Sequence, residues 1–266
     1  MTGTHGFAGY MHTTTQTAIP TTIRLDSRLN GPPRSANGGI ACGALAQAVG
    51  GTARVRLERP IPLGTDLEVQ LAADGLSAQV SAHRRPNLAA VTRLDPFTTP
   101  PPITPSYIDA LRASAASPLH GAHHMFSRCV VCGPGRPDGM HVTPGPLANR
   151  NRVLAAAFVP TEQDATDGVV HPAALWGALD CPSYPAQWLL GRRFGVLGTM
   201  AAHCSRQVRV GERLVAVGWT VAQHGRSIST ASALLDHRGN LVACASTVWV
   251  ELKNQWMVQL GARFVR

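Results

Sequence analysis

Aromatic and charged residues are both scarce in this sequence of 266 residues, at 5% and 15%. A folded core must therefore consist mainly of alanine, valine and leucine, and the 44% of apolar residues is enough to exclude a disordered chain. No apolar stretch approaches the roughly 18 residues that a membrane-spanning helix requires. The first 22 residues also lack the basic start and apolar run of a signal peptide. We therefore expect a soluble, cytoplasmic protein.

Lysine is almost absent, since Lys253 is the only one. The positive charge is carried by arginines, a bias that a GC-rich genome also produces, and the formal net charge of +9 favours anionic partners. These arginines are scattered and have no aromatic residues interleaved among them. The pattern favours a small phosphate-bearing ligand over nucleic acid.

The cysteines do not indicate a disulfide framework, because the chain is long and apolar enough to fold without one. Most of the six lie in apolar segments, where a free cysteine behaves as a small hydrophobic residue. Cys129 and Cys132 form one C-x-x-C motif, but the second ligand pair of a typical zinc site is missing. We expect a metal-free turn built on Gly133. The alternative, a zinc site, would draw on nearby histidines at His120, His123, His124 and His141.

A proline-dense stretch at 95–107 divides the chain, since such a stretch resists both helix and central strand. We divide the sequence into a flexible N-terminus (1–20), a first unit (21–95), a linker with the C-x-x-C motif (96–145) and a second unit (146–266). The first unit is predicted to contain strands at 21–29, 53–58, 66–71, 76–83 and 87–94 and a helix at 37–48. The linker is predicted to contain a short helix at 107–114. The second unit is predicted to contain strands at 153–160, 197–208, 213–222, 227–235 and 241–252 and a helix at 171–180.

Both units thus repeat one order: strand, alanine-rich helix, then four antiparallel strands. A shared phrase supports the repeat, because the segment 61–69 (IPLGTDLEV) parallels 208–216 (VRVGERLVA). Both helices are apolar nearly all round, which predicts that each is buried in a curved antiparallel sheet.

The pattern resembles the hotdog superfamily of acyl-CoA thioesterases and dehydratases. Asn37-Gly38-Gly39, followed by a P-x-P-x-G phrase at 60–64, is similar to the first unit of double-hotdog acyl-CoA thioesterases. The nine-residue spacing of His171 and Asp180 is similar to that of the His and the catalytic acid in the helix of phenylacetyl-CoA-type thioesterases. The segments 129–133 and 137–140 resemble a stretch that precedes the hotdog unit in some of these proteins. The resemblance implies an α+β fold of two tandem hotdog units, each an antiparallel sheet wrapped around a central helix.

The resemblance also implies a site shared by the two units, in which a helix N-terminus holds the thioester carbonyl and a carboxylate of the opposite helix attacks it or activates water. Each unit has kept one of these parts. Ala46 occupies the position that matches Asp180, and Pro172, which has no N–H, occupies the position that matches Gly38. We therefore expect one competent site, in which Gly38, with Asn37 or Asn30 nearby, faces Asp180. The alternative for Asp180 is a helix cap ahead of Pro182.

Further residues are assigned around this site. His171 is expected to act with Asp180, Gly38 and Asn37, although it could instead be a structural cap. Gly39, Trp176 and Thr199 are expected to contact the substrate, although Trp176 could be core and Thr199 an ordinary strand residue. Arginines are expected to meet the phosphates of coenzyme A, or else to be solvated surface charge: Arg192, Arg193 and Arg209.

Acyl-CoA hydrolysis is the predicted activity, with no metal and no cofactor beyond the coenzyme A of the substrate. A hydratase or dehydratase would need an Asp-x-Asn-Pro-x-x-His phrase, and the segment 167–171 (DGVVH) lacks its Asn-Pro. A non-catalytic acyl-CoA-binding protein is the second alternative. Exposed strand edges would allow such chains to form homo-oligomers.

Overall fold

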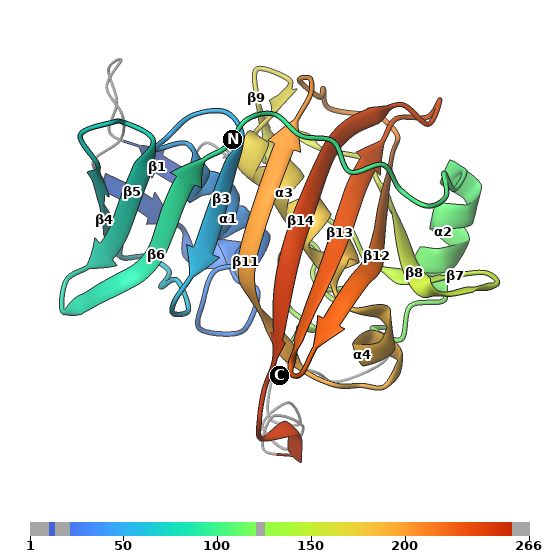
Figure 1. Ribbon diagram of the computed structural model, residues 1–266. Coiled ribbons are helices and arrows are strands. Elements are labelled where there is room, and N and C mark those ends of the chain that lie inside the picture. The colour runs from blue at the N-terminus through green and yellow to red at the C-terminus, as the bar shows by residue number, and fades with distance from the viewer. Residues whose placement is uncertain (1–10, 14–21, 121–125, 257–266) are drawn as a thin grey trace.

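The computed structural model describes residues 11–13, 22–120 and 126–256 (Figure 1). The segment 1–20, expected to be flexible, lies outside the described residues except for strand β1 (Met11–Thr13). β1 pairs antiparallel with β2 (Thr22–Leu25) and forms one end of the main sheet.

The first unit wraps five strands around helix α1 (Gly38–Ala46). Asn37 caps this helix through its side chain, and the helix is buried from Gly39 to Ala46, as its apolar sequence predicts. The strands alternate between buried and exposed residues, as in β4, where Leu67 and Val69 face the core. Besides β2, they are β3 (Ala53–Leu57), β4 (Asp66–Leu71), β5 (Ser77–Ala82) and β6 (Arg85–Arg93).

The second unit repeats the plan around helix α3 (Pro172–Asp180), which also has nine residues and is buried from Ala173 to Asp180. Its strands are longer, and a short helix, α4 (Ala186–Leu190), follows a 3-10 turn, η4 (Cys181–Ser183). The strands are β7 (Gly145–Leu147), β8 (Arg150–Phe158), β11 (Gly195–Cys204), β12 (Leu214–His224), β13 (Ser227–Leu235) and β14 (Leu241–Glu251). A separate small pair, β9 (Ala165–Thr166) and β10 (Val169–Val170), precedes α3 and follows a 3-10 turn, η3 (Glu162–Asp164).

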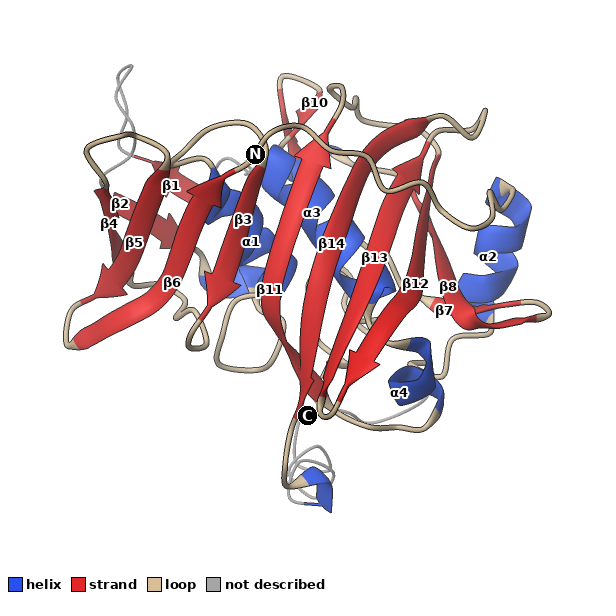
Figure 2. Cartoon of the chain, viewed as in Figure 1, coloured by secondary structure: helices blue, strands red, loops and turns tan. Residues whose placement is uncertain are grey.

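One sheet of twelve strands joins the two units, in the order β1-β2-β4-β5-β6-β3-β11-β14-β13-β12-β8-β7. Outward from the β3–β11 junction, equivalent strands of the two units follow in the same order on both sides. At the junction, Ala53 pairs with Ala202 and Arg56 with Thr199. Both helices lie on one face of this curved sheet, beside each other (Figure 2).

The proline-dense linker crosses the opposite face of the sheet before it reaches α2 (Tyr107–Ala115), as the green segment of Figure 1 shows. The Phe97 carbonyl accepts a hydrogen bond from the Cys244 thiol of β14. Further along, Thr104 lies against the β13–β14 turn at Gly239. The linker therefore covers part of the outer face of the second unit.

The predicted elements agree with the observed ones over most of the chain, but the strand expected at 21–29 is wrong beyond Leu25. Asp26 accepts a hydrogen bond from the Arg28 N–H and caps a 3-10 turn, η2 (Ser27–Leu29), which ends the strand. In the shared phrase, Gly64 and Gly211 both have positive φ angles, of 62° and 81°. Both units therefore turn into their next strand in the same way.

None of the helices in the described part of the chain combines the length and the apolar character that crossing a bilayer requires.

Arg136 fastens the segment 126–144 to the first unit. Its buried guanidinium donates to the side chain of Asn30 and to the carbonyls of Arg28 and Arg128, and it forms an ion pair with Asp138. Hydrogen bonds from Arg136 and Arg28 lower the pKa of Asp138 to about 2.

Replacing Asp138 by asparagine is expected to lower the free energy of unfolding at neutral pH by about 1 kcal/mol, because 26% of its side-chain surface is exposed and solvent screens the ion pair. The pKa of Asp138 is lower in the folded state, so its contribution is complete above about pH 4 and disappears as the pH falls toward 2. Urea unfolding of both proteins at a series of pH values would measure this loss. Asp95→Asn, at an exposed position, is the control, and a difference between wild type and Asp138→Asn that does not change with pH would contradict the assignment.

Candidate functional site

The site begins with the close crossing of α1 and α3, which three glycines allow. A Cβ atom on Gly39 would lie 2.4 Å from the Cβ of Asp180, and one on Gly43 would lie 2.7 Å from the Cα of Ala173. A Cβ on Gly177 would lie 2.8 Å from the side chain of Ile40. Gly43 and Gly177 hold equivalent positions in the two helices, so each helix contributes a glycine to the crossing. The N-terminus of α1 thereby meets the C-terminus of α3.

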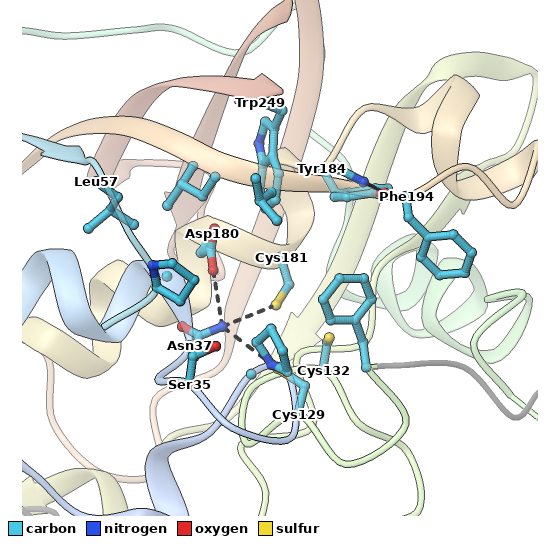
Figure 3. Close-up of a pocket in the computed structure, with 18 of the residues that line it drawn as sticks. Ser35, Asn37, Leu57, Cys129, Cys132, Asp180, Cys181, Tyr184, Phe194 and Trp249 are labelled. Atoms are coloured by element: carbon cyan, nitrogen blue, oxygen red, sulfur yellow. Dashed lines mark hydrogen bonds between the residues drawn. The ribbon is translucent and has the colours of Figure 1, made fainter. Parts of the chain in front are cut away.

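Asp180, the last residue of α3, is only 3% exposed at this meeting point. Its Oδ2 accepts hydrogen bonds from the Gly39 N–H and from Nδ2 of Asn37, both at 3.0 Å (Figure 3). Its Oδ1 is buried without a hydrogen-bond partner among the described residues. Burial raises the pKa of Asp180 to about 7, against the lowering effect of the two donors. A carboxyl group with such a pKa is suited to act as a base near neutral pH.

Asn37 links the helix cap to the carboxylate. Its Oδ1 accepts the Ile40 N–H at 2.9 Å and so fixes the side chain at the start of α1, while its Nδ2 points to Asp180. Gly38 is the first residue of the helix, so its N–H has no acceptor within the helix. This N–H, next to the carboxylate and at the positive end of the helix dipole, could donate to an oxyanion.

A cavity of about 470 Å³ opens beside these groups, and Asn37, Gly38 and Asp180 form part of its wall. Although aromatic residues are scarce in the chain, five of them line this cavity, and the rings of Tyr184 and Trp249 meet edge to face at 4.9 Å. The other three are Phe126, Trp188 and Phe194. Three exposed arginines also line it: Arg59, Arg192 and Arg193. The cavity is therefore lined mostly by apolar side chains, and its exposed charged residues are these three arginines and one acid, Glu58.

Three buried cysteines lie on the same wall of the cavity: Cys129, Cys132 and Cys181. Their sulfur atoms are all within 4.8 Å of one another, and Nδ2 of Asn37 lies 3.7 Å from Cys129 Sγ and 3.9 Å from Cys181 Sγ (Figure 3). The histidines that the sequence offered as partners of the C-x-x-C motif are not part of this cluster where the structure describes them, and His123 and His124 lie outside the described residues. Cys181, the third cysteine of the cluster, follows Asp180 directly, and no sequence motif pairs it with Cys129 and Cys132.

The structure brings four of the predicted site residues together: Asp180, Asn37, Gly38 and Gly39. Gly39 does not line the cavity, and its N–H is used by Asp180. At the other end of the helix pair, Ala46 and Pro172 hold the positions that correspond to Asp180 and Gly38.

Other predicted site residues do not line the cavity. His171 precedes α3 and shares a hydrogen bond with Thr166, and Trp176 is buried against Gly43 of the opposite helix. Thr199 pairs with Arg56 and Val248 within the sheet. Asn30 binds the segment 126–144. Arg209 does not reach the cavity either, whereas Arg192 and Arg193 do.

No family model and no curated protein matches the chain by sequence. Solved structures do match over nearly the whole chain. A protein of unknown function with a hotdog fold from Alicyclobacillus acidocaldarius is 11% identical, with a TM-score of 0.63, and the match covers 94% of this chain and 99% of that one. An acyl-CoA thioesterase II from Mycobacterium marinum is 16% identical, with a TM-score of 0.55 and coverages of 90% and 95%. A tesB protein from Mycobacterium avium subspecies paratuberculosis is 13% identical, with the same TM-score and coverages.

These matches span both units of the chain. The two units of the chain also have the same strand order as each other. The predicted α+β class and the antiparallel sheet around each central helix are thereby confirmed. The chain therefore has a double hotdog fold.

Proposed function

We propose that this protein hydrolyses acyl-CoA thioesters at a single site between its two units, with Asp180 as base or nucleophile. The observation that carries the proposal is the placement of a buried carboxylate from α3 against the N-terminus of α1, on the wall of an apolar cavity. The name of the Mycobacterium marinum structure, an acyl-CoA thioesterase II, supports the choice of substrate class.

The proposed reaction uses the parts as follows. The acyl chain lies among the aromatic residues, and the thioester carbonyl oxygen accepts the Gly38 N–H, which stabilises the oxyanion as it forms. In one course, Asp180 removes a proton from water, the hydroxide adds to the carbonyl carbon, and the C–S bond breaks as the proton passes from Asp180 to the sulfur of coenzyme A. In the other course, the Asp180 carboxylate adds to the carbonyl carbon and the C–S bond breaks, so that the coenzyme A thiolate leaves. Water then hydrolyses the acyl–aspartyl anhydride, which gives the free acid, restores Asp180 and supplies the proton for the thiolate. The phosphates of coenzyme A would be met by arginines that line the cavity, Arg59, Arg192 and Arg193, the last of which also pairs with Glu251.

The opposite end of the helix pair is proposed to be inactive. Ala46 brings no carboxylate, and Pro172 has no N–H to offer an oxyanion. One active site for each chain is therefore expected, and active-site titration should give a stoichiometry of one.

The proposal is tested by the release of thiol from a panel of acyl-CoA substrates with short, long and aromatic acyl groups. Turnover of at least one of them at neutral pH, well above the rate without enzyme, supports the proposal. The preferred acyl group then shows what size of acyl chain the cavity accepts. Binding of acyl-CoA without turnover would instead favour the acyl-CoA-binding alternative.

Asn37→Ser is expected to lower kcat/KM for the preferred substrate roughly 10- to 100-fold, the effect of one hydrogen bond to a charged group. Serine still caps a helix, so α1 should keep its stability, but the amide donor to Asp180 is lost. Steady-state kinetics and a thermal melt measure the two effects. Asn37→Ala should add a stability loss of about 1 kcal/mol to the same kinetic defect. If Asn37→Ser has the same kcat/KM as wild type, the amide donor to Asp180 is not needed for catalysis.

A further inference from the structure

The three cavity cysteines come from two segments that are far apart in the chain. Cys129 and Cys132 belong to the segment between the units, while Cys181 follows the last residue of α3. Zinc–sulfur bonds are about 2.3 Å long, so tetrahedral coordination needs sulfur atoms roughly 3.8 Å apart. Sulfur atoms within 4.8 Å of one another are therefore close to the arrangement that a metal ion imposes.

The turn from Cys129 to Gly133 holds two of the three cysteines on the cavity wall. Nδ2 of Asn37 approaches Cys129 Sγ from α1, at 3.7 Å. Gly133 closes the turn by donating its N–H to the Cys129 carbonyl at 2.9 Å. A Cβ at Gly133 would lie 2.6 Å from two carbonyl oxygens, so a larger residue does not fit. An amide donor close to sulfur favours the thiolate, the form in which cysteine binds metals.

Simple apolar packing does not account for this arrangement. Cys42 shows what packing alone produces, since it is fully buried in α1 and belongs to no such cluster among the described residues. The three cavity cysteines instead meet one another and an amide donor. The oxygens of Asp180 are not within the same ligand distance, so the site has three sulfur ligands and no carboxylate.

The geometry points to a site in which Cys129, Cys132 and Cys181 bind a thiophilic transition-metal ion such as Zn²⁺, with a fourth position facing the cavity. All three residues line the cavity, so a ligand at that position would come from its interior. Three protein ligands with one open position is an arrangement in which zinc also binds water or substrate. The site does not depend on the proposed hydrolase activity, because binding of the ion requires only the three thiols.

The first test is the zinc content of tag-free protein expressed with added zinc and purified with a phosphine reductant. We expect about one zinc ion for each chain of wild type after gel filtration. The same value is expected for Cys42→Ala, which removes a buried thiol outside the cluster. Cys132→Ala makes the same change inside the cluster, and its zinc content should be less than a tenth of the wild-type value.

The second test replaces zinc by Co²⁺ in stripped wild-type protein, without substrate. Bonds from thiolates to cobalt give an intense charge-transfer absorption, which we expect at a stoichiometry of one. Competition with a chelator should show affinity weaker by roughly 100-fold or more in Cys132→Ala, because loss of an outer-shell partner alone weakens metal binding 10- to 100-fold.

Wild-type protein that is fully reduced, free of zinc and without the charge-transfer absorption would overturn the site, even if no cysteine variant folds. Zinc retained equally by Cys132→Ala and wild type would also overturn it. Neither result would bear on thioester hydrolysis, which the thiol-release measurement decides separately.

Discussion

Asp180→Asn is expected to lower kcat/KM for acyl-CoA hydrolysis roughly 1000-fold, within the range of 10²–10⁴ that a general base contributes. An asparagine amide can neither remove a proton from water nor attack a carbonyl carbon. It has nearly the same shape as aspartate, and its oxygen can accept the donors that now reach Oδ2, the Gly39 N–H and Nδ2 of Asn37. The fold should therefore be unaffected. Stability should stay the same or rise, because a buried carboxyl group is removed.

Steady-state kinetics and thermal unfolding of the same preparations separate the two effects. Asp164→Asn is the matched control, since Asp164 is also a buried aspartate, 4% exposed, but accepts hydrogen bonds from the N-cap Thr161 in the 3-10 turn η3 and does not line the cavity. The control should keep wild-type kinetics. If Asp180→Asn keeps more than a tenth of the activity while folded, Asp180 is not the base or nucleophile, and its role at the end of α3 is structural.

Gly43→Val is expected to have the largest effect on stability, at least the 1–3 kcal/mol that overpacking a core costs. A Cβ at this position would lie 2.7 Å from the Cα of Ala173 and 2.8 Å from the Cβ of Trp176. Neither atom can move away by rotation of a side chain, because the Cα of Ala173 is part of the backbone and the Cβ of Trp176 is bonded directly to it. The helices must move apart, which also separates the N-terminus of α1 from Asp180. Loss of activity should therefore accompany loss of stability.

Chemical denaturation measures the free energy of unfolding, and thiol release measures the activity. Gly135→Val is the matched control, because a Cβ at Gly135 meets no atom within 4 Å. Gly43→Ala should fall between the two, with the same direction of change. Unfolding curves that coincide for Gly43→Val and Gly135→Val would show that the helix crossing is not as tight as described.

Local sequence patterns predicted most elements, because strand alternation and turn residues act over short distances. The strands at 66–71 and 227–235 have the predicted bounds. The helix at 171–180 ends at the predicted residue, and only its first residue, His171, lies outside it as the cap. The strand predicted at 21–29 was wrong after Leu25, because the Asp26 side chain competes for a backbone N–H there.

Contacts between distant segments were harder to predict. The proximity of Asp180 to Asn37 followed only from the resemblance, since the two lie 143 positions apart in the sequence. Trp176 is one turn before Asp180, yet it packs against Gly43 at the helix crossing and not into the cavity. The cluster of Cys181 with Cys129 and Cys132 depends on how the segment 126–144 folds back over the first unit, which no short-range pattern specifies. The aromatic lining of the cavity arises in the same way, from this segment, from α4 and the turns on either side of it, and from β14.

Because both units belong to one chain, we expect the activity of the protein to be insensitive to dilution. The proposed catalytic groups come from different units, with Asn37 and Gly38 in the first and Asp180 in the second. Two separate polypeptides would lose such a site as they dissociate at low concentration, but a tether holds its partners at an effective concentration of about 1 mM or more. Specific activity should therefore stay constant however far the protein is diluted. Because the two units occupy different stretches of one chain, their helices can also differ, so that α3 supplies the carboxylate and α1 the backbone N–H.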